Sequence, residues 1–198
     1  MGLMQQFAHP HGISGRLVGR LMALFNADQV KAVVRTVAPV AGEHILEIGF
    51  GPGVGLAALA TTAPRAQVSG IDPSRDMLAA SQHRCRQFGD RVQLREGSAD
   101  ALPWPDASFD AVCATNSVQL WRPRDASLAE VLRVLRPGGR LVLGVHERAV
   151  LPQGGRAGRT FHDTLVPQVT AAGFTDISWE WQPAKPGVAL LLQATRPT

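Results

Sequence analysis

The interpretation of the whole chain begins with one stretch, Glu47-Ile48-Gly49-Phe50-Gly51-Pro52-Gly53-Val54-Gly55. The apolar residues at 44–48 have the length of a short buried strand, and the Ala/Leu-rich residues at 56–60 indicate a helix. Glycine between them permits unusual backbone angles and lets the main chain approach a ligand closely. A strand, a glycine-rich turn and a helix are typical of the start of an α/β nucleotide-type site.

The spacing of the glycines excludes two common phosphate sites. A dinucleotide fingerprint requires Gly-x-Gly-x-x-Gly, but its sixth position is Val54 when counted from Gly49 and Leu56 when counted from Gly51. A Walker A loop fails as well, because no Gly-Lys-Ser/Thr follows. The acid at the end of the strand, Glu47, would repel a pyrophosphate but would attract a cation.

This stretch resembles motif I, Glu-x-Gly-x-Gly-x-Gly, of the class I S-adenosylmethionine (SAM)-dependent methyltransferases. The resemblance implies that the backbone at Gly49, Gly51 and Gly53 packs against the methionine part of SAM. It also implies that Glu47 holds the ammonium group of SAM, directly or through water. Taken alone, such a turn could equally be a tight strand-to-helix connection.

A second stretch, Asp-Pro-Ser-Arg-Asp-Met-Leu at 72–78, follows an expected strand at 67–71. It resembles the family pattern D-x-S-x-x-M-L. An acid at the end of that strand, Asp72, is expected to accept hydrogen bonds from both ribose hydroxyls. The resemblance also places Pro73 and Met77 at the cofactor, although a helical methionine is more often a core residue.

The longest match, at 97–110, follows an expected strand at 91–96 and resembles G-D-A-x-x-L-P-F-x-D-x-S-F-D. In the family, the Asp after the glycine bonds the adenine amino group. This chain has Ser98 there, whose uncharged hydroxyl should bind more weakly, and Asp100 could replace it. The resemblance makes the Ala99 N–H the donor to the ring and places Leu102 beside it. Trp104 is expected either there or in the core.

The acceptor side carries fewer signals. The resemblance places the loop after an expected strand at 109–115, beginning with Asn116, at the cofactor and the acceptor. That loop lacks the Pro-Pro motif of amino-base methyltransferases, and Cys113 lacks the preceding proline of cytosine C5 enzymes. His146 is the best candidate for a general base because histidine can take up a proton near neutral pH. A local structural role for His146 is the preferred interpretation.

Composition is consistent with one globular domain. The chain has 198 residues, 45% of them hydrophobic, and no apolar run of the roughly 18 residues that a membrane span needs. The net charge is +4 and the arginines are dispersed, so nucleic-acid binding is only mildly supported. Two cysteines without a metal or disulfide pattern, and a start unlike a signal peptide, suggest a reduced cytoplasmic protein.

The resemblance implies an α/β fold: a Rossmann-like seven-stranded sheet of order 3-2-1-4-5-7-6, with strand 7 antiparallel. Residues 1–43 are expected to form an N-terminal helical cap, or helices that only cover the sheet, and 44–198 to form the SAM-binding core. The closest likeness is to the small "type 11" methyltransferases.

The predicted function is methyl transfer from SAM to a small-molecule acceptor, with S-adenosylhomocysteine (SAH) as the product and no metal. The alternatives are an RNA or protein methyltransferase and a non-catalytic SAM-binding module. Nucleic acid and a membrane span are disfavoured, and a homodimer is left open.

Overall fold

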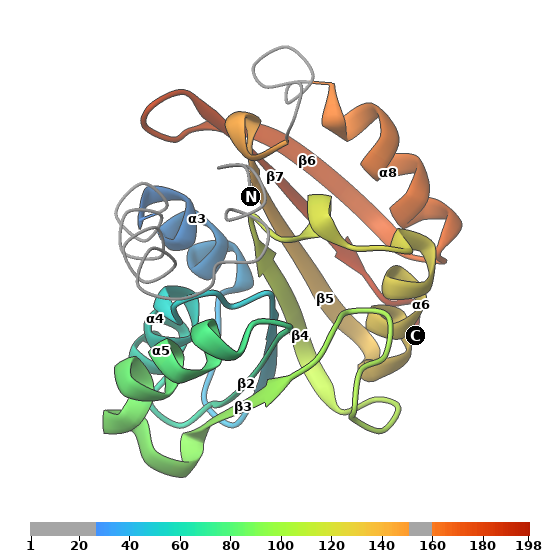
Figure 1. Cartoon of the computed structure of the whole chain (residues 1–198). Helices are drawn as coiled ribbons and strands as arrows, with labels where there is room; N and C mark the ends of the chain where they lie inside the picture. Colours follow the sequence, from blue (N-terminus) through green and yellow to red (C-terminus); the bar gives the residue numbers. More distant parts are fainter. Residues whose placement is uncertain (1–26, 151–159) are drawn as a thin grey trace.

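A computed structural model of the protein describes residues 27–150 and 160–198. Seven strands form one sheet in the order β3-β2-β1-β4-β5-β7-β6, which confirms the predicted order (Figure 1). Strands β1 to β5 are parallel to their neighbours among these five, and β7 runs antiparallel to both β5 and β6. The strands are β1 His44–Ile48, β2 Gln67–Asp72, β3 Val92–Glu96, β4 Phe109–Thr115, β5 Leu135–His146, β6 Thr175–Pro183 and β7 Val188–Thr195.

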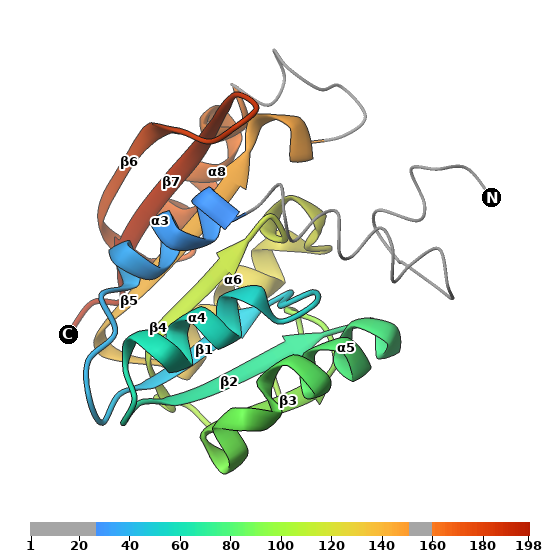
Figure 2. The same cartoon turned by 90° about the vertical axis from the view of Figure 1, so that its left-hand side faces the viewer.

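Helices cover both faces of the sheet (Figure 2). One face carries α3 (Ala27–Val37), α4 (Val54–Thr62) and α5 (Arg75–Cys85), and the other carries α6 (Arg124–Val134) and α8 (Phe161–Ala171). The parallel strands are therefore buried on two sides, and alternate residues of β1 enter the two layers. Short 3₁₀ helices that the sequence did not predict complete the described elements: η1 (Arg86–Arg91), η2 (Val118–Leu120) and η3 (Glu147–Ala149).

Sequence patterns explain where two of the helices begin and end. Helix α3 buries Val30, Val33, Val34 and Val37, which lie on one face at helical spacing, and it ends before Pro39. Helix α5 begins after Ser74, whose hydroxyl accepts a hydrogen bond from the Met77 N–H at 3.4 Å, as a capping serine should.

The expected cap can be compared with the structure only in part. Helix α3 packs against β4, β5 and α4, so this portion of residues 1–43 covers the sheet. Apolar residues at helical spacing, Ile13, Leu17 and Leu21, predict a first helix of the cap, and the glycine-rich residues 154–158 predict a loop; both lie outside the described residues. Within the described ranges, no helix is long and apolar enough to cross a membrane.

One detail of the prediction was wrong. In the sequence, Pro137, Gly138 and Gly139 predict a sharp turn that leads into the fifth strand, but β5 already starts at Leu135. The register with β4 passes from Phe109–Leu135 to Ala111–Arg140, so the Pro-Gly-Gly segment is a bulge within β5. The Gly138 N–H donates to the Arg196 carbonyl, and the Arg196 N–H donates to the Gly139 carbonyl. These two backbone hydrogen bonds hold the bulge.

Candidate functional site

The glycine loop joins β1 to α4 at the carboxyl edge of the sheet, where open α/β sheets bind ligands. Its backbone is held from outside. The Gly49 N–H donates to the Ile71 carbonyl at 2.8 Å, and the Gly51 N–H donates to Asp72 Oδ2 at 2.8 Å. The Ser81 hydroxyl donates to the Gly51 carbonyl at 2.9 Å. Strand β2 and helix α5 thus fix the loop in one conformation.

The glycines of this stretch differ in what surrounds them. A Cβ on three of them would collide with a side chain of the protein itself: Gly49 with Ser117, Gly53 with Ser81 and Gly55 with Glu47. A Cβ at Gly51, in contrast, would have none of the described residues within 4 Å. Gly51 has a φ of +52°, a value that favours glycine. The open space in front of Gly51 is therefore a cradle that a side chain would fill and that a ligand can enter.

Glu47 is a buried acid near the end of β1, and its carboxyl lies against Gly55 of the same stretch. Its side chain accepts a hydrogen bond from the Leu56 N–H, but Oε2 has no hydrogen-bond partner among the described residues. Burial raises the pKa of the Glu47 carboxyl to about 8; the Leu56 bond opposes this rise and the nearby charge of Asp72 adds to it. A buried carboxyl with an unpartnered oxygen fits a cationic group such as the ammonium of SAM.

Asp72 lies at the end of β2, as predicted, and is 7% exposed. One carboxylate oxygen accepts from the Gly51 N–H at 2.8 Å and the other accepts from the Ser74 N–H at 2.9 Å. Asp72 therefore shapes the glycine loop and the start of α5. Its role toward a ribose stays a prediction, since carboxylate oxygens can accept further bonds.

The segment after β3 brings together the two candidates for the adenine amino group. The Ser98 hydroxyl is hydrogen-bonded to Asp100 Oδ1, so the two side chains form a pair. Ala99 and Leu102 are buried in the core cluster on the α6 side of the sheet, and Met77 is buried in the cluster on the other side.

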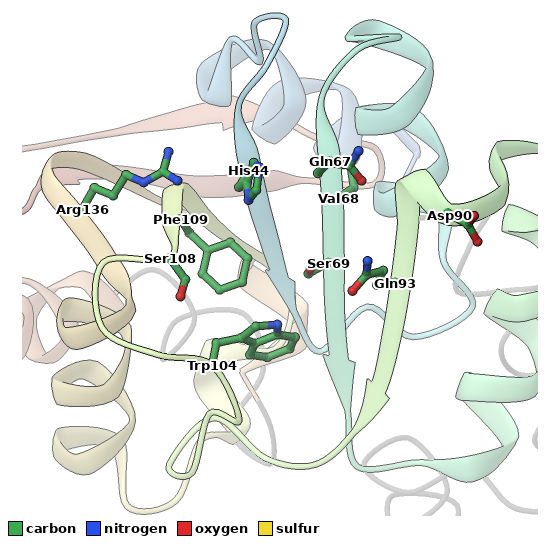
Figure 3. Close-up of a pocket in the computed structure, with 10 residues that line it drawn as sticks. All are labelled: His44, Gln67, Val68, Ser69, Asp90, Gln93, Trp104, Ser108, Phe109 and Arg136. Atoms are coloured by element: carbon green, nitrogen blue, oxygen red, sulfur yellow. The ribbon is translucent and has the colours of Figure 1, made fainter.

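Trp104 packs on the face of the sheet. Its ring meets Phe109 edge-on, with centroids 5.4 Å apart, and the Arg95 guanidinium lies 5.0 Å from its ring centroid. Trp104 also lines a hollow of about 680 Å³ with residues from the amino-terminal ends of β1 and β2, among them His44 and Gln67 (Figure 3). Those ends are opposite the glycine loop, so this hollow is separate from the candidate ligand site.

Asn116 ends β4 and connects three other elements. Its φ of +56° lies in the left-handed region, which asparagine tolerates better than most residues. Its side-chain Nδ2 donates to Gln29 Oε1 of α3 at 2.8 Å, and Oδ1 accepts from the His146 N–H at 2.8 Å. Its carbonyl accepts from Gln119 Nε2 at 2.8 Å. The neighbouring Ser117 hydroxyl donates to the Ile48 carbonyl at 2.6 Å, which ties this turn to the glycine loop.

His146 is 7% exposed at the end of β5. Its Nδ1 accepts from the Arg148 N–H at 3.1 Å, and its Nε2 lies 3.2 Å from the Ala184 carbonyl oxygen. Because a carbonyl can only accept, Nε2 carries the proton, and both ring nitrogens are in use. This geometry favours the local structural role for His146, because neither ring nitrogen is free to act as a general base.

Comparison with known proteins supports the same assignment as the geometry. A family model described as "Methyltransferase domain" matches residues 45–139, which include the glycine loop, Asp72, the Ser98–Asp100 pair and the Asn116 turn. Residues 45–139 therefore form a methyltransferase domain, and its motifs and strand order are those of the class I SAM-dependent methyltransferases. Enzymes of this family use SAM as the methyl donor. The open space at Gly51 and the buried Glu47 fit that cofactor.

Relatives of the methyltransferase differ in how much of their length it covers. The uncharacterized methyltransferase YdaC of Bacillus subtilis (strain 168) is 26% identical over 91% of this chain and 98% of that protein. The demethylmenaquinone methyltransferase of Clavibacter sepedonicus is 43% identical over 57% of this chain, but the match spans only 44% of that protein. Phosphoethanolamine N-methyltransferase 2 of Haemonchus contortus, solved with SAM, shares the fold with a TM-score of 0.69 and 18% identity, over 86% of this chain and 53% of that one.

Several site residues of the methyltransferase were not predicted. Gln29 carried a signal, because it lies one helical turn before Val33 on the otherwise apolar buried stripe of α3. Ser81 and Ser117 carried none, since each contacts a segment distant in sequence, and Gln119 lies in the predicted acceptor loop but bonds a backbone carbonyl three residues away, which its residue type alone does not reveal. In the described part of the enzyme, no three His, Cys, Asp or Glu side chains are grouped so that they could hold a metal ion.

Proposed function

We propose that the enzyme transfers the methyl group of SAM to an uncharged small molecule held between the glycine loop and the Asn116 turn. The observation that carries this proposal is that open space at Gly51 and an unpartnered oxygen of Glu47 occur together at the carboxyl end of β1. SAM, when bound, supplies a methyl group on a cationic sulfur. The protein then has to hold the acceptor in line with that methyl and exclude water.

The cofactor contacts follow the sequence motifs. The backbone of the loop packs against the methionine part, and Glu47 accepts from the ammonium. The Ser98–Asp100 pair accepts from the adenine amino group, because the hydroxyl bonded to Asp100 leaves acceptor positions on both side chains. The remaining proposed contacts come from Gly49, Gly53, Asp72, Pro73, Met77, Ala99, Leu102 and Asn116.

Ion pairs between arginines and carboxylates of this chain favour a small acceptor over RNA. Arg75, Arg133, Arg136 and Arg140 each form an ion pair with a carboxylate of this chain, so their charges are already matched. A nucleic-acid surface would instead present unpaired basic side chains on one face. The demethylmenaquinone methyltransferase among the relatives points to a quinone-type ring as the acceptor class.

Two further features are part of the proposal. Both cysteines, Cys85 and Cys113, are free and buried, which suits a reducing cytoplasm. Residues 1–43 and 44–198 would form one domain, with α3 reaching from the sheet face to the Asn116 turn.

The test is a methyl-transfer assay with SAM labelled on its methyl group. The panel contains 1,4-dihydroxynaphthalene, phosphoethanolamine, total RNA and an unrelated protein, each under reducing conditions. We expect label in the dihydroxynaphthalene alone. Label in RNA or protein would overturn the acceptor class, and label in none of them, with SAM bound, would favour the non-catalytic alternative.

A further inference from the structure

Four buried side-chain polar atoms have no hydrogen-bond partner in the described part of the chain: Gln29 Nε2, Glu47 Oε2, Gln119 Oε1 and Trp121 Nε1. Such atoms are rare in folded proteins because leaving them unpaired is costly. All four belong to the carboxyl edge of the neighbouring strands β1 and β4. Glu47 is at the end of β1, Gln119 and Trp121 follow β4, and Gln29 is bonded to Asn116.

The orientation of the two glutamine amides is determined by backbone groups. The His146 N–H can only donate, so the atom of Asn116 that receives it is the oxygen, and Nδ2 must donate to Gln29 Oε1. The Asn116 carbonyl can only accept, so it receives Nε2 of Gln119. The unpartnered ends are therefore an N–H donor on Gln29 and a carbonyl acceptor on Gln119.

Both amides lie inside the protein, at 3% exposure for Gln29 and 7% for Gln119. Gln29 reaches the end of β5 because Gly144 has no side chain there; a Cβ at Gly144 would lie 3.3 Å from Gln29 Nε2. Helix α3 crosses the sheet in front of β4 and β5, which brings Gln29 to the turn after β4 (Figure 2). Gln29 and Gln119 are thus both bonded to Asn116, one to its side chain and the other to its carbonyl, at the edge where the acceptor is expected.

We propose that Gln29, Asn116 and Gln119, here called the amide triad, recognise a neutral hydroxyl group of the acceptor. The hydroxyl oxygen accepts from Gln29 Nε2, and its hydrogen is donated to Gln119 Oε1. The triad orients the acceptor and does not itself take up a proton. This inference rests on the proposed function and narrows its acceptor to hydroxyaromatic compounds such as hydroquinones.

The triad also selects against charged acceptors. Uncharged amides cannot balance a phosphate, a carboxylate or an ammonium group, and a buried charge without a partner is strongly unfavourable. A hydroxyl, in contrast, needs one donor and one acceptor, which are the two groups left unpaired here. Sites that hydrogen-bond a substrate hydroxyl reject analogues that lack it.

The experiment measures anaerobic binding of 1,4-dihydroxynaphthalene and of 1,4-dimethoxynaphthalene to the SAH-loaded enzyme. The methoxy compound keeps the ring but cannot donate. We expect the wild type to bind the dihydroxy compound at least tenfold more tightly. In Gln119→Met this preference should fall below threefold, whereas Gln29→Met should weaken both compounds, because a methoxy oxygen also accepts from Gln29 Nε2; SAH affinity should be unchanged in both variants. Gln168→Met is the matched control, since this glutamine also accepts a hydrogen bond, from Arg124, but lies on α8.

The ratio of the two affinities separates recognition from a structural role. If Gln119→Met weakens both compounds equally and leaves the ratio unchanged, it merely loosens the turn and the proposal is overturned; unchanged binding of both compounds by Gln29→Met would overturn it as well. A wild type that binds SAH but neither naphthalene, or both equally, would overturn it too. A wild type that does not bind SAH would instead contradict the proposed function itself.

Discussion

The loop after β1 and the turn after β4 lie on neighbouring strands but are built differently. In the glycine loop, backbone groups make the surface, and Asp72 and Ser81 hold those groups from behind. In the Asn116 turn, side-chain amides from α3 and η2 make the surface. The loop presents backbone and open space, whereas the turn presents specific donors and acceptors.

This difference corresponds to two demands on the enzyme. The cofactor is the same for every member of the family, so its site can be encoded in short motifs with fixed spacing. The acceptor differs among members, and its site is assembled from residues far apart in sequence. Variants in the loop should therefore affect SAM, and variants at Gln29 and Gln119 should affect the acceptor only.

Gly51→Val should have the largest effect, because the new side chain fills the cradle. We expect loss of SAM binding by more than 100-fold in titration calorimetry. Gly89→Val is the control for the backbone strain of a valine at positive φ. Gly89 has a similar φ of +56°, and a Cβ there would also have no described residue within 4 Å. Normal SAM binding by Gly51→Val would remove the loop from the cofactor site.

Asp72→Ala tests whether the acid after β2 acts on the loop and the ribose together. We expect SAM affinity to fall by about 1–3 kcal/mol, the scale of a hydrogen bond to a charged group. Asp90→Ala, an exposed acid after α5, should leave affinity unchanged. An unchanged affinity in a folded Asp72→Ala protein would rule out the ribose role.

Glu47 makes SAM binding depend on pH. Binding of a cation favours the charged carboxylate, so SAM affinity should rise several-fold as the pH increases from about 6 to the Glu47 pKa of about 8. Glu47→Gln should remove this part of the rise. Equal pH profiles for the two proteins would show that Glu47 does not face the ammonium.

The same carboxyl affects stability in the opposite direction. Its pKa is raised in the folded state, so its contribution to stability is complete below the unfolded value of 4.5 and is lost as the pH rises through about 8. Thermal melts of the enzyme without SAM should therefore show Glu47→Gln gaining stability relative to wild type over that range.

Ser98→Asp should have the smallest effect. It restores the acid that the family uses at this position, and a charged acceptor bonds an amino group more strongly than a hydroxyl does. We expect SAM to bind about threefold more tightly by calorimetry, with the preference between the two naphthalenes unchanged. Weaker binding would indicate that the Ser98–Asp100 pair is already the better acceptor.

The sequence predicted most of the fold because its signals are local. Strands β1, β2 and β4, the Ser74 cap and the antiparallel β7 follow from hydrophobic patterns and motifs. The Pro-Gly-Gly segment misled the prediction, because a turn and a bulge use the same residues and differ only in pairing with the neighbouring strand. Ser81 and Ser117 were missed because a hydrogen bond to a distant segment leaves no local pattern.

The most direct test of the account is a calorimetric titration of the wild-type enzyme with SAM and SAH, with NADH as the control. The account predicts micromolar binding of both adenosyl ligands and none of NADH, because the loop suits a cation and lacks the dinucleotide spacing. Binding of NADH, or of neither adenosyl ligand, would contradict the assignment of the glycine loop and Glu47 to SAM.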